Sequence, residues 1–225
     1  MPSNPQIPLA FDYRPSMSGE DFLVSDSNRE AVAFLDLWPQ WPSPFAIIYG
    51  EAGCGKSHLA QVFSEATKAI EIKLNVDPYI SMGDHQTGVV EDVDGLIAEN
   101  QQALFHLYNF AKENDAHILL TSRTSPALWD IQLADLKSRI GAASVIEIGQ
   151  PDDTLIEAVL VKQFADRQLH VERDVVAFML TRMERSFDQA RLLVNEIDQQ
   201  SLAQKRKITI PLVRSVFQNL SLSSQ

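Results

Sequence analysis

The segment at residues 50–57 fits the pattern G-x-x-x-x-G-K-[ST], which is typical of a phosphate-binding loop. Its glycines let the backbone curl so that successive N–H groups point at phosphate oxygens. The apolar run at 45–49 predicts a strand that ends at the loop, and residues 57–66 predict the helix that follows, with its N-terminal end facing the phosphates. We therefore expect a nucleotide-binding site here, rather than a glycine-rich turn that contains Lys-Ser by chance.

Two side chains of the loop have predicted roles in this chemistry. Lys56 would reach the β- and γ-phosphates, and the Ser57 hydroxyl would bind Mg²⁺. The loop residues that we expect at the nucleotide are Gly50, Gly53, Cys54, Gly55, Lys56, Ser57 and His58.

The composition excludes several other classes of protein. The formal net charge of -11 argues against a broad DNA-binding surface, because such a surface needs clustered Lys and Arg. No apolar run approaches the ~20 residues of a membrane span, and the N-terminus does not resemble a secretion signal, so we expect no membrane partner. The single cysteine, Cys54, excludes an intrachain disulfide and suits a reducing, cytoplasmic location.

The sequence pattern predicts three parts. Residues 1–21 are rich in Pro, Ser and Asn and are expected to form a flexible leader. From 22 to 150, strand and helix patterns alternate, which predicts an α/β domain with a parallel five-stranded sheet flanked by helices. From 151 to 225 only helical patterns remain, which predicts a small all-α subdomain hinged near Pro151.

Several predicted elements bear on the site. Strands are expected at 45–49, 69–74, 87–94, 116–122 and 143–148, and helices at 57–66, 101–114 and 133–140. Residues 75–87 are expected to be a polar, turn-rich connection. In the helical subdomain, one apolar stripe is expected to comprise Leu192, Leu193, Val194, Ile197 and Leu202.

Two acids end the predicted strand at 87–94 and complete the chemistry of a phosphate-binding loop. Glu91 would lie nearest the Mg²⁺ shell, and Asp92 is the candidate base that orients an attacking water. The predicted metal-binding set is therefore Ser57, Glu91 and Asp92. The alternative is that both acids are solvated residues of a turn.

An α/β nucleotide domain followed by a helical lid is the AAA+ arrangement, and five segments resemble the DnaA family within it. The resemblance runs from about residue 22 to 220, and it implies a P-loop AAA+ fold with ADP or ATP as the nucleotide. The matching segments are 48–59 (phosphate-binding loop), 90–93 (acidic motif), 120–126 (sensor 1), 136–140 (arginine finger) and 185–191 (sensor 2).

The departures from that family are also informative. DnaA carries a helix-turn-helix domain after the lid and a pair of DNA-gripping helices between the phosphate-binding loop and the acidic strand. The sequence ends where the first would begin, so we expect it to lack that domain, and 75–87 is too short for the second. The chain thus resembles a DnaA-family core without a direct DNA-binding domain. The resemblance implies a replication regulator that stimulates hydrolysis of DnaA-bound ATP and so prevents over-initiation.

Two arginines have roles that the resemblance implies. Arg139 would act as an arginine finger toward a γ-phosphate bound to another protein, with an intrachain salt bridge to Asp135 as the alternative. The same face makes a homo-oligomer possible. Arg191 would contact the chain's own nucleotide, with pairing to Glu196 or Asp188 as the alternative.

Two further substitutions weaken the case for hydrolysis by the chain itself. The family usually has Asp at the first acidic position, where this sequence has Glu91, and it tends to have Asp where this sequence has Arg123.

The leader contains the pattern Gln-x-x-Leu-x-Phe at residues 6–11, similar to peptides that bind the bacterial sliding clamp, the beta subunit of DNA polymerase III. Leu9 and Phe11 would fill an apolar pocket of the clamp, and Gln6 would hydrogen-bond at its rim. The alternative is a leader that packs on its own domain through Leu9 and Phe11.

The sequence is also compatible with two other functions. One is an autonomous AAA+ ATPase or a helicase-loader relative, and the other is a non-catalytic adaptor on the clamp that uses nucleotide only to fix its lid.

Overall fold

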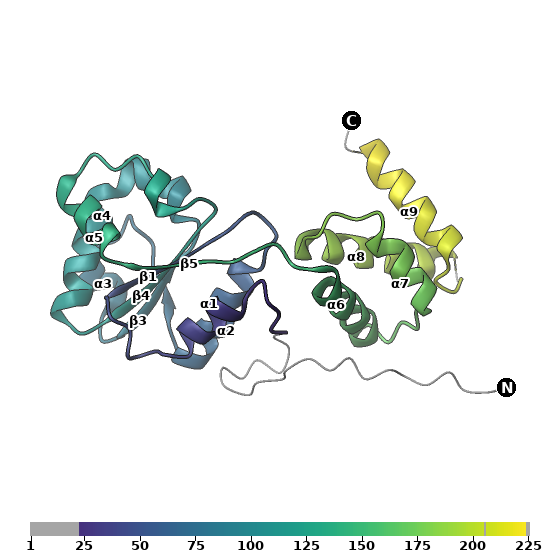
Figure 1. Cartoon of the computed structure of the whole chain (residues 1–225), viewed down its shortest axis with the longest axis horizontal. Helices are drawn as coiled ribbons and strands as arrows, with labels where there is room; N and C mark the ends of the chain where they lie inside the picture. The colour runs from purple at the N-terminus through teal and green to yellow at the C-terminus, as the bar shows by residue number, and fades with distance from the viewer. Residues whose placement is uncertain (1–22, 205, 224–225) are drawn as a thin grey trace. The chain divides into compact units, whose positions relative to one another are not determined.

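A computed structural model describes residues 23–204 and 206–223 of the chain. These residues form two compact units: one is Asp26–Gln150, and the other comprises Leu23–Ser25 and the described residues from Pro151 onward. The first unit is built on a five-stranded parallel sheet with the strand order β2-β3-β4-β1-β5 (Figure 1). The predicted parallel sheet with flanking helices is therefore confirmed.

The elements of the α/β unit alternate along the chain. They are α1 (Arg29–Leu35), β1 (Phe45–Tyr49), α2 (Lys56–Thr67), β2 (Ile70–Glu71), α3 (Pro78–Met82), β3 (Thr87–Val90), α4 (Val93–Glu113), β4 (His117–Ser122), the 3-10 helix η1 (Pro126–Leu128), α5 (Ala134–Gly141) and β5 (Ser144–Glu147).

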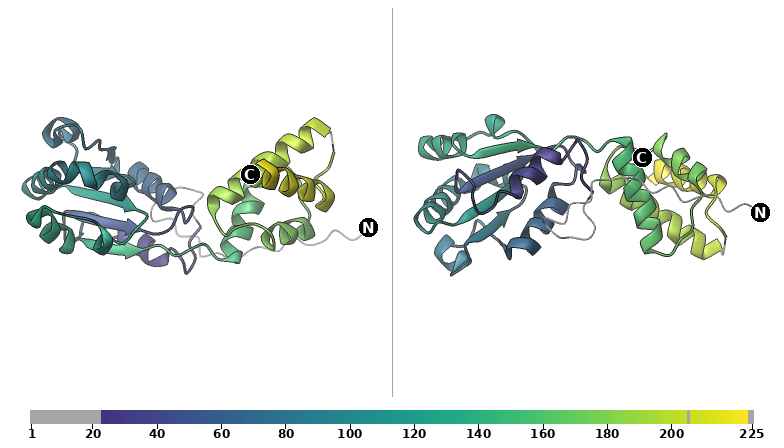
Figure 2. Two further views of the ribbon diagram at one scale, coloured as in Figure 1. Left: turned by 90° about the horizontal axis from the view of Figure 1, so that it is seen from above. Right: turned by 60° about the horizontal axis from the view of Figure 1, so that its bottom comes forward.

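Helices cover both faces of the sheet. Helices α1 and α2 lie on one face, and α3, α4 and α5 lie on the other, as Figures 1 and 2 show. The two central strands are accordingly apolar without alternation: Ile47 of β1 and Leu119 of β4 are both fully buried. The core on the α4 side joins both strands to α4 and α5, through residues such as Leu104 and Leu136.

The register of the sheet brings three strand ends to one edge. Tyr49 pairs with Ser122 in neighbouring strands, and Val90 pairs with Leu120. The carboxyl ends of β1, β3 and β4 therefore lie side by side. In open parallel sheets, this edge is where ligands bind.

The predicted strand at 87–94 was too long, and the helix predicted at 101–114 begins much earlier. Strand β3 ends at Val90, and α4 already begins at Val93. Val93 and Ile97 are both buried and spaced by one helical turn, so the short apolar run continues into a helix rather than a strand.

Two other connections also differ from the prediction. The strand expected at 69–74 is only Ile70–Glu71, although Ile72 still donates its N–H to the Val89 carbonyl. The stretch 75–87 contains the five-residue helix α3, which the sequence pattern did not predict. The Asp77 carboxylate caps α3 by accepting the Tyr79 N–H at 2.8 Å.

The second unit comprises α6 (Asp153–Asp166), α7 (Arg173–Leu180), α8 (Phe187–Gln204) and α9 (Ile210–Ser223). Its core includes Leu193, Val194 and Ile197, which are fully buried at helical spacing. Leu192 and Leu202 were wrongly predicted to join this stripe: they point away from it and are 43% and 68% exposed.

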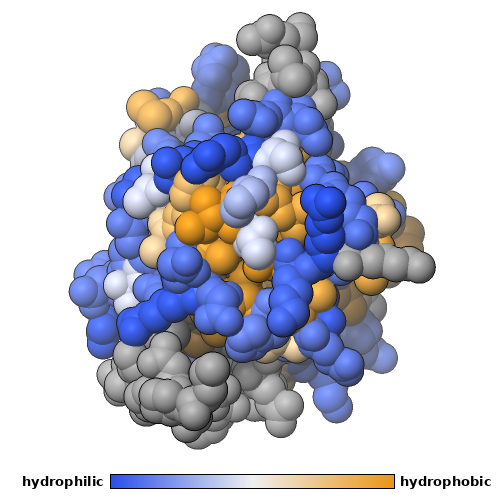
Figure 3. Space-filling model, turned by 90° about the vertical axis from the view of Figure 1, so that its right-hand side faces the viewer, coloured by the Kyte–Doolittle hydropathy of each residue, from blue (hydrophilic) through white to orange (hydrophobic). Residues whose placement is uncertain are grey.

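The surface of the helical unit is mixed in polarity. Partly buried hydrophobic side chains such as Phe178 and Phe217 extend its core outward. Figure 3 shows apolar side chains gathered within a ring of hydrophilic ones on one face of the molecule. Among the described residues, no helix combines the length and the apolar character needed to cross a bilayer.

Candidate nucleotide-binding site

The loop between β1 and α2 has the curled backbone that its glycines predict. Gly53 and Gly55 have φ values of 74° and 104°, a region that residues with a side chain seldom adopt. Gly55 is also the N-cap of α2 and supplies no capping side chain. The first N–H groups of this 12-residue helix therefore remain available to an anion.

Gly50 holds the loop close to the neighbouring strands. Its N–H donates to the Ser122 carbonyl at 3.2 Å. A Cβ at this position would lie 2.4 Å from the Ile148 carbonyl oxygen and 3.0 Å from Cys54 Sγ. The close approach to backbone at Ile148 requires glycine.

Gly50→Ala is expected to lower the free energy of unfolding by about 1–3 kcal/mol, because the strand end or the loop must shift to admit the methyl group. Thermal and urea unfolding would measure the loss. The matched control is Gly95→Ala, an exposed position in α4 with open space around the Cβ, where about 0.5–1 kcal/mol of stabilisation is expected. Equal stability of Gly50→Ala and the native chain would contradict this account of the loop.

Lys56 is 7% exposed and points into the hollow of the loop. Its ammonium donates to the carbonyls of Gly50 at 2.7 Å and Glu51 at 2.9 Å. Cys54 Sγ lies 3.8 Å from the same nitrogen. Burial raises the pKa of the Cys54 thiol, with the Lys56 charge acting in the opposite direction, so the thiol packs as a small neutral side chain. The charge of Lys56 is thus held at the centre of the loop.

Two other residues predicted to contact the nucleotide are exposed to solvent. Ser57 and His58 are exposed in the first turn of α2. Glu51 accepts a hydrogen bond from Gln150 Nε2 at 2.7 Å, which ties the loop to the end of the α/β unit.

Asp92 lies beside the loop at the end of β3. It adopts a left-handed conformation, with φ 50° and ψ 43°, and is the N-cap of α4. Its N–H donates to Thr121 Oγ1 of β4 at 3.1 Å, and its carboxylate lies 3.7 Å from Arg123 Nε. Asp is one of the few residues with a side chain that tolerates this conformation. Glu91, the residue before it, is exposed.

Asp94 fixes the segment that follows β4, a role that the sequence pattern did not predict. Its Oδ2 accepts hydrogen bonds from the Arg123 N–H at 3.1 Å, the Thr124 N–H at 3.2 Å and Thr124 Oγ1 at 3.2 Å. The sequence signal was an acid in the first turn of a helix. Its partners are 29 and 30 residues away, so only the fold reveals the contact.

The acids at this edge do not form a complete metal site by themselves. Within 23–204 and 206–223, no group of three or more His, Cys, Asp or Glu side chains is placed to hold a metal ion. Mg²⁺ commonly uses one or two carboxylates together with phosphate oxygens and water. The set of Ser57, Glu91 and Asp92 fits this mode of Mg²⁺ binding, in which phosphate oxygens and water complete the ligands. Its metal-binding role stays a prediction.

Arg139 lies on α5, half-buried against α4. The carbon of its guanidinium is 5.4 Å from the centroid of the Tyr108 ring. Its Nε is buried and has no hydrogen-bond partner among the described residues. The alternative pairing with Asp135 is not among the ion pairs of the described chain. The finger role of Arg139 stays a prediction.

The remaining predicted residues lie elsewhere. Arg191 is exposed on α8 of the helical unit, and its role toward the nucleotide stays a prediction. Gln6, Leu9 and Phe11 lie outside the described residues.

A protein-family model described as "Hda, lid domain" matches residues 152–217. Over nearly the whole chain, an uncharacterized protein of Haemophilus influenzae is 26% identical, covering 95% of this chain and 99% of that protein. The chromosomal replication initiator protein DnaA of Campylobacter jejuni subsp. doylei is 24% identical, covering 91% of this chain and 53% of DnaA. The chain thus spans about half the length of the DnaA relatives that it matches.

Solved structures are similar over both units. Domain III of the Thermotoga maritima replication initiation protein DnaA matches with a TM-score of 0.79 at 18% identity, covering 92% of this chain and 97% of that chain. AMPPCP-bound DnaA from Aquifex aeolicus matches with a TM-score of 0.66 at 21% identity, covering 83% and 66%. A Thermotoga maritima RuvB variant, at 13% identity, has a TM-score of 0.71 and coverage of 91% and 72%.

The sheet order, the phosphate-binding loop after β1 and the helices after β5 define an AAA+ protein. Within that class the chain is similar to DnaA, and residues 152–217 are similar to the lid domain of Hda. The predicted fold class, an AAA+ domain followed by an all-α lid, is confirmed.

Proposed function

We propose that the chain binds an adenine nucleotide with Mg²⁺ at the edge formed by the carboxyl ends of β1, β3 and β4. The buried ammonium of Lys56 and the uncapped start of α2 supply the positive electrostatics that a polyphosphate needs. Ser57, Glu91 and Asp92 would hold the Mg²⁺ together with phosphate oxygens and water. The likeness to DnaA structures that contain AMPPCP supports the same choice of ligand.

On this basis we propose that the chain is an Hda-like regulator that stimulates hydrolysis of ATP bound to DnaA, preventing over-initiation of replication. The observation that carries this proposal is the match of residues 152–217 to the Hda lid. Arg139 is the finger that would act on the γ-phosphate of DnaA-bound ATP. No intrachain ion pair of the described residues occupies its guanidinium, which supports action on another protein.

The contact between Arg123 and Asp92 favours this function over that of an autonomous ATPase. The candidate base has a cation 3.7 Å away, although both side chains are more than half exposed. A cation at this distance competes with the water or the metal that Asp92 would orient. We therefore expect the chain to hydrolyse its own nucleotide slowly.

The decisive experiment is hydrolysis of DnaA-bound ATP with the chain added, in the presence and absence of DNA-loaded sliding clamp. Clamp-dependent acceleration is the expected result. Tight nucleotide binding without acceleration would instead favour the non-catalytic adaptor. Rapid ATP turnover by the chain alone, abolished by Asp92→Ala, would favour the autonomous ATPase or helicase-loader relative.

Clamp binding through the leader gives a separate prediction. Gln6→Ala is expected to weaken binding to the clamp by about tenfold, which corresponds to about 1.4 kcal/mol for one lost rim hydrogen bond. Surface plasmon resonance on immobilised clamp would measure it. Asn4→Ala, which removes an amide of the leader outside the motif, should leave the affinity unchanged. An equal loss of clamp affinity in both variants would contradict a specific role of the motif at 6–11 in clamp binding.

A further inference from the structure

Helix α5, which carries Arg139, is short and has weak support of its own. It contains eight residues, and its N-cap Leu133 makes no side-chain capping hydrogen bond. A helix of this length depends on tertiary contacts to form at all. Leu136 and Ile140 supply part of them by packing into the core beside α4.

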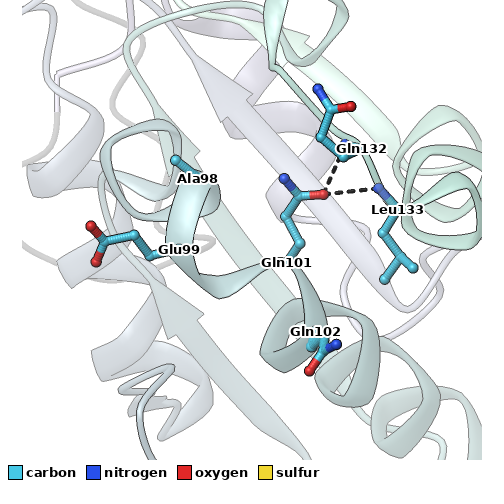
Figure 4. Close-up of a pocket in the computed structure, with 6 residues that line it drawn as sticks. All are labelled: Ala98, Glu99, Gln101, Gln102, Gln132 and Leu133. Carbon is cyan, nitrogen blue, oxygen red and sulfur yellow. Dashed lines mark hydrogen bonds between the residues drawn. The ribbon is translucent and has the colours of Figure 1, made fainter.

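Gln101 of α4 supplies the polar contacts at the start of α5. Its Oε1 accepts the N–H groups of Gln132 and Leu133, both at 2.9 Å, and its Nε2 donates to the Asp130 carbonyl at 3.2 Å. Figure 4 shows the amide oxygen of Gln101 directed at these two N–H groups. One side chain therefore holds the backbone that leads into α5.

A break in α4 places Gln101 for this role. Asn100 has non-helical torsions, with φ −123° and ψ 23°, and its own amide caps the preceding segment at the Leu96 carbonyl, 2.8 Å away. Gln101 begins the next helical segment. It lines a hollow of about 430 Å³ together with Ala98, Glu99, Gln102, Gln132 and Leu133 (Figure 4).

Tyr108 contacts α5 two turns further along the same helix. Seven residues separate it from Gln101, so the two side chains lie on one face of α4. The Tyr108 ring is 6% exposed, packs edge-on against Phe45 at 5.1 Å and supports the Arg139 guanidinium at 5.4 Å. Helix α4 thus contacts both the backbone that leads into α5, through Gln101, and Arg139 within α5, through Tyr108.

We propose that Gln101 and Tyr108 are positioning residues that fix the direction in which Arg139 reaches the nucleotide of its partner. This inference rests on the proposed function of Arg139. Gln101 sets where α5 begins, and Tyr108 limits the directions open to the guanidinium. A catalytic group displaced by about 1 Å can lose about 100-fold in rate, so such positioning has a large effect on catalysis.

The test uses the full chain in the assay of DnaA-bound ATP hydrolysis. Gln101→Ala and Tyr108→Leu are expected to lower the maximal stimulated rate about tenfold to 100-fold, with unchanged ADP affinity and unchanged half-saturating concentration of the chain. In Gln102→Ala, the control, the changed side chain lines the same hollow but makes no hydrogen bond to the described residues 130–133, so the variant should retain the full rate. Tyr108→Phe keeps the ring and should also retain it.

A double variant separates positioning from general structure. In an Arg139→Ala background, Gln101→Ala is expected to cause no further loss, because the group that it positions is already absent. The same fold-loss in both backgrounds, or full activity of Gln101→Ala, would overturn the inference while leaving the proposed function intact. A native chain that fails to stimulate DnaA would overturn the proposed function, and the inference with it.

Discussion

Arg139→Ala is expected to lower the stimulated rate of DnaA-bound ATP hydrolysis by about 10³-fold or more. An arginine finger places a permanent, delocalised positive charge on the oxygens that gain charge in phosphoryl transfer, and its removal has effects of that size. The fold should tolerate the change, because the described contact that is lost is the one with the Tyr108 ring, worth about 0.5–1 kcal/mol. Single-turnover hydrolysis with DNA-loaded clamp would measure the rate.

The matched control is on the same helix. Lys137→Ala removes one positive charge from an exposed position of α5, two residues before Arg139, and should keep the full rate. Arg139→Lys should recover little activity, because an ammonium lacks the planar, two-pronged donor geometry of guanidinium. Full stimulation by Arg139→Ala would contradict the finger role of Arg139. The contact between Arg139 and Tyr108 would then have only a structural role.

The conformation of the loop between β1 and α2 could be predicted from the sequence because all its parts are local. The strand Phe45–Tyr49, the glycines and the helix Lys56–Thr67 follow one another within 23 residues, and each has its own signal. The left-handed torsions of Gly53 and Gly55 are what such glycines predict. The parallel sheet flanked by helices followed from general rules for alternating α/β chains, whereas the strand order came only from the structure.

The rest of the site was hidden because its contacts join distant segments. Asp94 and Gln101 both bind backbone about 30 residues ahead, and nothing local to either residue indicates the partner. The break in α4 at Asn100 could not be predicted from the sequence either. An Asn side chain can hydrogen-bond nearby backbone in a loop as well as in a helix, so its presence does not indicate a break. The early start of α4 was missed because Val93 extends the apolar run of β3.

Lys56→Ala is expected to weaken ADP binding by roughly 2–5 kcal/mol, which is about 30-fold or more. The ammonium is buried in the loop, and no other described cation contacts the Gly50 and Glu51 carbonyls that hold it. Its loss removes the charge that faces the phosphates and leaves two carbonyl oxygens without their donor. Isothermal titration calorimetry with Mg²⁺ and ADP would measure the affinity, and thermal unfolding would report the effect on the loop itself.

Lys73→Ala is the control for this change, because it removes the same charge from an exposed position and should bind ADP as the native chain does. Lys56→Ala and Arg139→Ala then separate two roles that one AAA+ domain combines. The first should lose the chain's own nucleotide, and the second should keep it while losing action on DnaA. Unchanged ADP affinity in Lys56→Ala would contradict nucleotide binding at the loop. Lost affinity with full stimulation of DnaA would instead mean that Arg139 acts without any nucleotide bound in its own domain.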